Sequence, residues 1–168
     1  MSGAVGGVVQ LLVPLALSRH GSSAGAIGIA LSVASVVYVL ASGVVVRLGA
    51  RATRLPFNAA MTGLTALALL PALFGSSMWW LESVLVLTSI PRAAIGTLAY
   101  PLSVSEIGDS DRRASVFGHL NAVWAAAMMS APLAAGLLAE HLGIRATYAV
   151  ALAISTVCSA YLAATVRL

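Results

Sequence analysis

Apolar residues run through this chain in six long stretches that are separated by short polar segments. The stretches cover residues 3–18, 24–46, 55–74, 79–102, 116–139 and 144–165. A helix needs roughly 20 apolar residues to cross the hydrocarbon core of a bilayer. The pattern therefore predicts an all-α membrane protein with six transmembrane helices. The first stretch is the shortest, since its 16 residues would span only about 24 Å of a core that is about 30 Å thick.

The composition agrees with lipid as the main solvent of the chain. Hydrophobic residues make up 60% and charged residues only 8% of the 168 residues, whereas about a quarter of a soluble domain is charged. We therefore treat residues 1–168 as a single membrane domain. The lone cysteine, Cys158, excludes a disulfide within the chain and a cysteine-based metal site. We expect neither a metal ion nor a cofactor.

The arginines predict how the helices are oriented, because the cytoplasmic loops of membrane proteins are enriched in positive charge. All nine basic residues are arginine. Six spans would place on one side Arg47, Arg51, Arg54, Arg112, Arg113 and Arg167, and on the other side only Arg19 and Arg145. We expect both termini to be cytoplasmic, in a bacterial-type plasma (inner) membrane. No basic stripe with interleaved aromatics occurs, so nucleic acid is not an expected partner.

A hexapeptide occurs twice at equivalent places. LGARAT fills residues 48–53, between the second and third stretches, and LGIRAT fills residues 142–147, between the fifth and sixth. Dividing the chain into residues 1–75 and 76–168 gives two three-helix repeats. Because each repeat has an odd number of spans, the two would enter the membrane from opposite sides, as an inverted-topology repeat. The glycine of each copy would allow a tight turn after a helix end.

The first hexapeptide also carries part of a known signature. Arg47, Gly49 and Arg51 resemble the second half of G-x-L-x-D-R-x-G-R-R, the loop signature of the major facilitator superfamily. Arg92 and Gly96 resemble the R-x-x-x-G of that family's fourth helix. Val46 stands where the signature has its acidic residue, so the charge relay with which the family holds its inward gate is in doubt.

A third motif is similar to that of one branch of the family. Residues 127–136, AMMSAPLAAG, resemble G-x-x-x-G-P-x-x-G-G in the fifth helix of drug:proton antiporters, with Ala131, Pro132 and Gly136 at its centre and end. The resemblance implies one six-helix half of a transporter that exports a solute and is coupled to protons. Arg92 favours the N-terminal half, whereas the missing acidic residue favours the C-terminal half, which is our preferred interpretation.

Arg92 is the sharpest single candidate for a functional residue. It lies about 20 Å from the start of its helix, which is deep in the bilayer. An arginine there normally faces a cavity or a partner, so it would contact solute or protons, or else bond backbone carbonyls for packing. The acidic residues lie near the ends of the predicted helices or in the loops. If transport is driven by protons, the titrating carboxylate would then belong to a second unit. A facilitator that needs no protons is the alternative.

Polar and aromatic residues in the other stretches are candidates for a cavity lining, and ordinary hydrogen bonds between helices are the alternative. They are Gln10, Tyr38, Asn58, Tyr100, Asn121 and Trp124. Asp109, Asp111, Arg112 and Arg113 would form a charged loop that either gates the cytoplasmic side or is simply solvated. Few charges and apolar walls favour a hydrophobic or amphipathic solute.

We do not expect an enzyme. The chain contains no G-x-S-x-G, no H-E-x-x-H and no phosphate-binding loop with lysine, so no catalytic residues can be assigned. Six helices would pair with a second six-helix half, or with a second copy as a homodimer, in the lipid bilayer. The alternative to transport of a small molecule is a non-transporting fragment, or a membrane subunit with a structural or interaction role.

Overall fold

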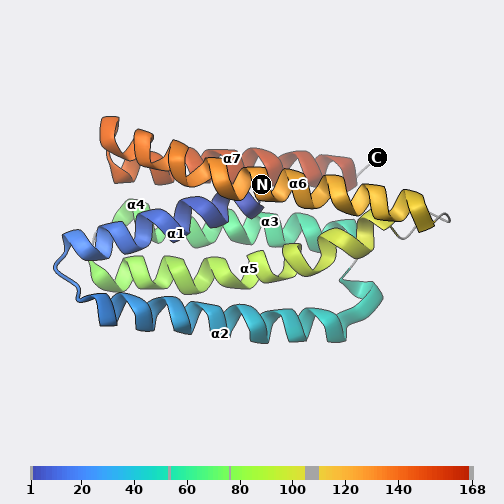
Figure 1. Cartoon of the computed structure of the whole chain (residues 1–168), viewed down its shortest axis with the longest axis horizontal. Coiled ribbons are helices and arrows are strands. Elements are labelled where there is room, and N and C mark those ends of the chain that lie inside the picture. Colours follow the sequence, from blue (N-terminus) through green and yellow to red (C-terminus); the bar gives the residue numbers. More distant parts are fainter. Residues whose placement is uncertain (1, 53, 76, 105–109, 167–168) are drawn as a thin grey trace.

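The computed structural model describes residues 2–52, 54–75, 77–104 and 110–166, which fold as a bundle of helices (Figure 1). The α-helices are α1 (Ser2–Arg19), α2 (Ala24–Leu48), α3 (Leu55–Leu69), α4 (Pro71–Phe74), α5 (Met78–Val104), α6 (Ser110–His141) and α7 (Ile144–Val166), and a 3-10 helix, η1 (Gly49–Arg51), follows α2. These residues contain no β-strand. Arg167, Asp109 and the side chain of Tyr100 lie outside the described part of the chain.

Two helices differ from the apolar stretches that predicted them. The stretch 55–74 is interrupted at Leu70, where α3 ends and α4 begins. Pro71 causes the break because it has no N–H and its ring clashes with the carbonyl four residues earlier. The N–H of Leu70 instead donates to the carbonyl of Leu67 at 3.1 Å, which is the tighter 3-10 pattern.

The second difference corrects the expected charged loop. Asp111, Arg112 and Arg113 lie in the first turns of α6, which starts at Ser110 rather than at residue 116. An acidic residue is favourable at this position because the N-terminal end of a helix carries partial positive charge. Hydropathy missed these turns because a helix that continues into water has no need of apolar residues.

Four helices are long and apolar enough to cross a membrane. They are α2, α6, α7 and the segment Pro56–Phe74, which comprises α3 and α4. α1 is apolar but shorter. α5 is not among the four over its described residues. Lipid burial of these apolar helices makes the chain an integral membrane protein.

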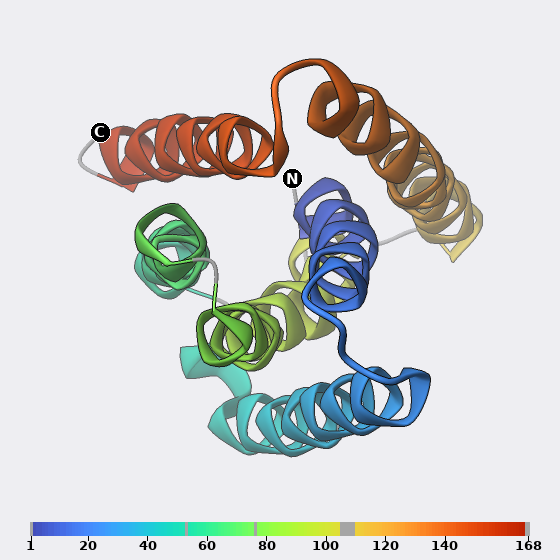
Figure 2. The ribbon, with the colours of Figure 1, turned by 90° about the vertical axis from the view of Figure 1, so that its left-hand side faces the viewer.

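α1 and α5 occupy the centre of the bundle, and the other helices surround them (Figure 2). α1 packs mainly along α6, α5 packs along α2 and α3, and α3 also packs along α7. The largest cluster of buried apolar residues accordingly contains Val9, Leu12, Val13 and Leu17 of α1 with Leu81, Val84 and Leu85 of α5. α1 and α5 therefore form the core on which the outer helices pack.

The glycines of both hexapeptides adopt backbone conformations that favour glycine. Gly49 has a φ of 53° and Gly143 a φ of 86°. Each follows the end of a long helix, and the N–H of Gly49 donates to the carbonyl of Val46. The predicted turn role of these two glycines is confirmed.

Candidate functional site

A cavity of about 340 Å³ lies between the four helices α1, α2, α5 and α6. Its lining consists of Gln10, Leu31, Ala34, Ser35, Tyr38, Val39, Leu85, Ser89, Arg92, Trp124 and Met128. Cavities of this size can hold small organic ligands. The site therefore combines mostly apolar walls with a few polar side chains and one charge.

Arg92 supplies that charge from the middle of α5. It lies 14 residues after Met78 and 12 before Val104, so about 20 Å of helix separate it from either end. Its side chain is half-buried and rests against α1, because a Cβ added at Gly6 would lie 2.8 Å from the Arg92 Nη2 atom. The glycine thus makes room for the guanidinium at the wall of the cavity.

Gly96 plays the same spatial role for an aromatic residue. A Cβ at this position would lie 3.0 Å from the hydroxyl oxygen of Tyr38, so the missing side chain of Gly96 lets α2 and α5 approach each other around the phenol. Arg92 and Gly96 lie one helical turn apart, and their side-chain positions therefore share one face of α5. That face is turned toward the cavity.

The serines of the cavity are already engaged in their own helices. The Oγ of Ser89 donates to the carbonyl of Leu85 at 2.8 Å, and the Oγ of Ser35 donates to that of Leu31 at 2.9 Å. This pattern is typical of helices in an apolar environment. Arg92, Tyr38 and the remaining polar side chains, Gln10 and Trp124, are consequently the groups best suited to contact a solute.

Arg92 is the one charged residue in the lining of the cavity. α1 and α2 contain no acidic residue, α5 contains Glu82 near its start, and α6 contains Asp111 and Glu140 near its two ends. None of these carboxylates lines the cavity. Within the described residues, the positive charge of Arg92 is therefore not neutralised at the site itself.

A family model for the Major Facilitator Superfamily matches residues 1–168. The chain belongs to the major facilitator superfamily. Members of this superfamily are membrane transporters rather than enzymes. No curated protein and no solved structure matches the chain.

Residues 127–136, which resemble the antiporter motif, lie on α6, and some of them contact α1. A Cβ at Gly7 would lie 2.9 Å from Cδ of Pro132 and 3.1 Å from Cβ of Ala131. Gly136 packs less tightly, since a Cβ added there would lie 3.7 Å from Cδ2 of Leu11. Ala131, Pro132 and Gly136 therefore act in packing, and they bring α6 close enough to α1 for Trp124 to reach the cavity.

Two predicted lining residues of this superfamily member lie elsewhere. Asn58 is buried on α3, where its Nδ2 donates to the carbonyl of Arg54 at 3.3 Å. It thereby bonds the first turn of its own helix. Asn121 is exposed on α6 and is not part of the cavity lining. Tyr38 and Trp124, in contrast, line the same cavity as Arg92.

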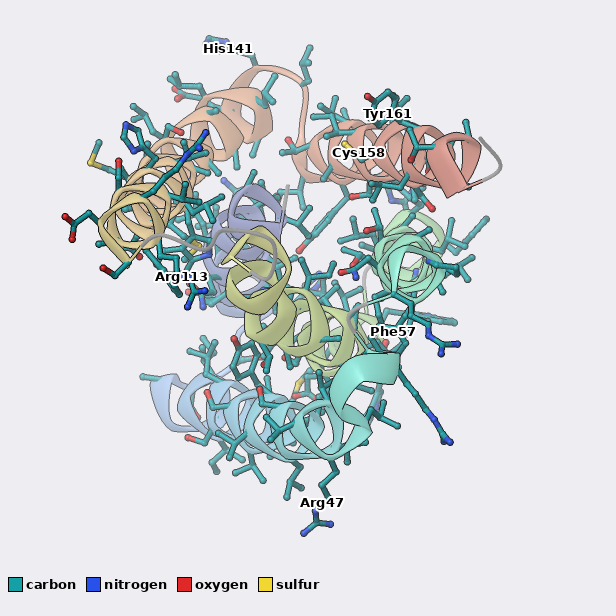
Figure 3. All side chains as sticks on the ribbon, turned by 90° about the vertical axis from the view of Figure 1, so that its right-hand side faces the viewer. Arg47, Phe57, Arg113, His141, Cys158 and Tyr161 are labelled. Atoms are coloured by element: carbon teal, nitrogen blue, oxygen red, sulfur yellow. The ribbon has the colours of Figure 1, made fainter. Side chains whose placement is uncertain are left out.

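The loop signature lies at one end of the bundle, remote from the cavity. Arg47 lies in the last turn of α2 and projects away from the bundle (Figure 3). Arg51 lies in η1 and is exposed. Together with Gly49 between them, these residues form the turn into α3.

The glycines of α1 were not among the sequence candidates, although they position the site. Gly6 accommodates Arg92, Gly7 accommodates Pro132, and Gly3 packs against Trp124, whose Cδ1 would be 3.1 Å from an added Cβ. The spacing of Gly3 and Gly7 is the small-xxx-small pattern of closely packed membrane helices. That spacing is the sequence pattern from which these close helix contacts could have been predicted.

Proposed function

We propose that the chain is a six-helix unit of a secondary transporter that moves a small hydrophobic or amphipathic solute across the membrane, in the direction of efflux. The observation that carries this proposal is the cavity around Arg92, at mid-depth between α1, α2, α5 and α6. Membership in the superfamily supports transport, and the cavity supplies a place at which a solute could bind halfway across.

The lining favours an amphipathic solute over a sugar. Leu31, Val39, Leu85 and Met128 offer apolar contact, whereas Arg92 offers several donors in a fixed planar group. A sugar needs many hydrogen bonds, and the serines of the cavity are bonded to their own helices. A solute with an apolar body and one acceptor or anionic group fits both parts of the lining.

The proposed partner is a second six-helix unit, supplied by another chain or by a second copy of this one. The most apolar segment of α2 buries only 17% of its residues within the bundle, and that of α6 only 11%. Both helices flank the cavity. A second unit seated on this side would cover their exposed apolar surface and close the cavity toward lipid.

The packing also supports the proposed inverted repeats, residues 1–75 and 76–168. α1, the first helix of one repeat, packs on α6, the second helix of the other, and α5 packs on α2 in the reciprocal way. The third helices, α3 and α7, pack on each other. A two-fold exchange of the repeats would reproduce these pairs. With the arginine distribution, this arrangement favours cytoplasmic termini in a bacterial-type inner membrane.

Proton coupling would require a carboxylate from the second unit. The lining of the cavity contains Arg92 but no acidic residue. A partner carboxylate near Arg92 would be held ionised by the guanidinium until a proton or solute displaced it. The resemblance to drug:proton antiporters is the basis for proposing this coupling.

The direct test is transport by purified protein in sealed vesicles. Fluorescent amphipathic dyes that are negatively charged, neutral or positively charged would be loaded, and their movement would be followed with and without a proton gradient. Movement that depends on Arg92 supports the proposal. Dye movement equal to that of protein-free vesicles, for the chain alone and for the chain with any co-purified second unit, would contradict it and favour a structural or interaction subunit.

A further inference from the structure

A second, smaller cavity lies at the end of the bundle where α1 ends and α7 begins. It has a volume of about 110 Å³, which is too small for a drug-sized ligand. Arg19 and His20 line it at the end of α1, and Arg145 lines it in the first turn of α7. Figure 2 views the bundle from this end. The two arginines that are expected on the external side thus line the same cavity.

One residue that lines this cavity has a buried hydroxyl group without a hydrogen-bond partner. Tyr148 lines the cavity and is fully buried, with 0% of its surface exposed. Its hydroxyl oxygen is the one buried side-chain polar atom among the described residues that has no hydrogen-bond partner. Leaving such a group unsatisfied costs about 1–3 kcal/mol, so a ligand that accepts its hydrogen bond would be favoured.

The electrostatics of this cavity favour an anion. Ile144 and Arg145 are the first two residues of α7 and both line the cavity, so the positively polarised N-terminal end of that helix adjoins it. The nearby carboxylates, Glu82 and Glu140, are not part of the lining. Arginine side chains, a helix N-terminus and a free hydroxyl together match the oxygens of a phosphate group.

The position of the cavity points to lipid as the source of that phosphate. Gly75 lines the cavity and lies in contact with the indole of Trp80, which is exposed on α5 together with Trp79. Exposed tryptophans of this kind gather at the level of the lipid headgroups. The cavity therefore lies where headgroup phosphates are concentrated.

We propose that Arg19, Arg145 and Tyr148 form a binding site for a phosphate-type oxyanion, and that the headgroup of an anionic phospholipid supplies it. This site is separate from the cavity around Arg92, and it does not depend on the transport function proposed above. A bound lipid phosphate would bond the tyrosine hydroxyl, neutralise the two arginines and link the ends of α1 and α7.

The test is lipid binding by the full chain in detergent, measured by native mass spectrometry while phosphatidylglycerol is titrated against phosphatidylcholine. Arg145→Gln removes a charge and should weaken binding of phosphatidylglycerol about tenfold, as expected for the loss of a hydrogen bond to a charged group. Tyr148→Phe removes only the hydroxyl oxygen and should weaken it about threefold or more.

The repeated hexapeptide and the second tyrosine of α7 provide matched controls. Arg51 occupies in the first hexapeptide the position that Arg145 occupies in the second, so Arg51→Gln makes the same change of charge at the opposite end. Tyr161 is exposed on the same helix as Tyr148, so Tyr161→Phe removes a hydroxyl that lies outside the cavity. Both controls should bind phosphatidylglycerol like the unaltered chain.

The outcomes distinguish binding at this site from general attraction between charges. They also distinguish binding of a lipid headgroup from binding of free phosphate. Equal losses in Arg145→Gln and Arg51→Gln, or no loss in Tyr148→Phe, would overturn the proposal. Inorganic phosphate is the second probe, measured by its effect on the unfolding temperature. If millimolar phosphate competes with phosphatidylglycerol, the site accepts the oxyanion from either source. If phosphate has no effect while the variants lose lipid, the site is specific for the lipid headgroup.

Discussion

The guanidinium of Arg92 lies against the backbone of Gly6, so closely that a Cβ on Gly6 would come within 2.8 Å of Nη2. This contact joins α5 to α1 at the middle of the proposed membrane depth. Because the contacting atoms are the far end of a flexible side chain, the guanidinium could move away without disturbing either helix. The contact therefore sets where the charge lies rather than whether the protein folds.

Gly6→Ala should accordingly alter function more than stability. We expect the methyl group to displace the guanidinium and to weaken dye binding or transport, while the unfolding temperature changes little. The matched control is Gly28→Ala on α2, where a Cβ would meet nothing within 4 Å. Equal transport by the two variants would show that the position of Arg92 is unimportant.

Arg92→Gln should abolish dye transport without unfolding the protein. An arginine at the centre of a membrane helix costs about 2.5–3.5 kcal/mol on insertion scales, so its removal should leave the unfolding temperature unchanged or raised. Arg92→Lys keeps the charge but loses the planar fork and should transport more slowly. Arg47→Gln, at an exposed helix end, provides the control for loss of charge. Full transport by Arg92→Gln would contradict the proposed role.

The contact between Gly7 and Pro132 should be important for stability instead. Proline cannot rotate its ring away, so Gly7→Ala should push α1 and α6 apart and destabilise the fold by about 1–3 kcal/mol, the usual cost of overpacking. Thermal unfolding in detergent measures this effect. Gly43→Ala on α2, which opens into free space, should cause no loss. A neutral Gly7→Ala would mean that the two helices can separate freely.

The two hexapeptide glycines should respond alike to substitution. Gly49→Ala and Gly143→Ala each force a side chain onto a positive φ, at a cost of about 1–2 kcal/mol. Gly118→Ala, inside α6 and with nothing within 4 Å of its Cβ, should be neutral or slightly stabilising because alanine is the better helix former. Unfolding temperatures of the three variants test the shared turn role directly.

The proposed orientation can be tested with single cysteines. Starting from Cys158→Ser, we expect His141→Cys to react with a membrane-impermeant maleimide in intact cells. Ser115→Cys should react only after the cells are opened. Both positions are exposed and lie near opposite ends of α6. Labelling of Ser115→Cys from outside would reverse the proposed topology.

The helices were largely predictable because a hydropathy pattern shows the length of each apolar segment, and a helix must be apolar over that length to cross a bilayer. The same measure could not detect the break at Leu70, which comes from the missing N–H of Pro71, nor the polar turns that begin α6 at Ser110. In both places the local structure does not depend on how favourably the residues transfer from water to lipid.

The site was predictable in part. The depth of Arg92 followed from its place along α5, and Tyr38 and Trp124 share its cavity. Asn58 was expected in the cavity because it is polar, but polarity shows only that a side chain needs a hydrogen-bond partner. For Asn58 that partner is the backbone carbonyl of Arg54 and not a group at the cavity. The role of Gly6 depends on a contact between two helices, which no local pattern specifies.

The length of α6 has a mechanical consequence. Its 32 residues extend about 48 Å, some 18 Å more than a hydrocarbon core, and Figure 1 shows its first turns projecting beyond the other helices. Pro132, which lies against α1, is 22 residues from Ser110. A tilt of about 10° around that contact would move Ser110 by about 6 Å. A label attached to these first turns, outside the membrane, would therefore move farther than the residues at the cavity. It would report a small tilt of α6 at the cavity as a larger displacement.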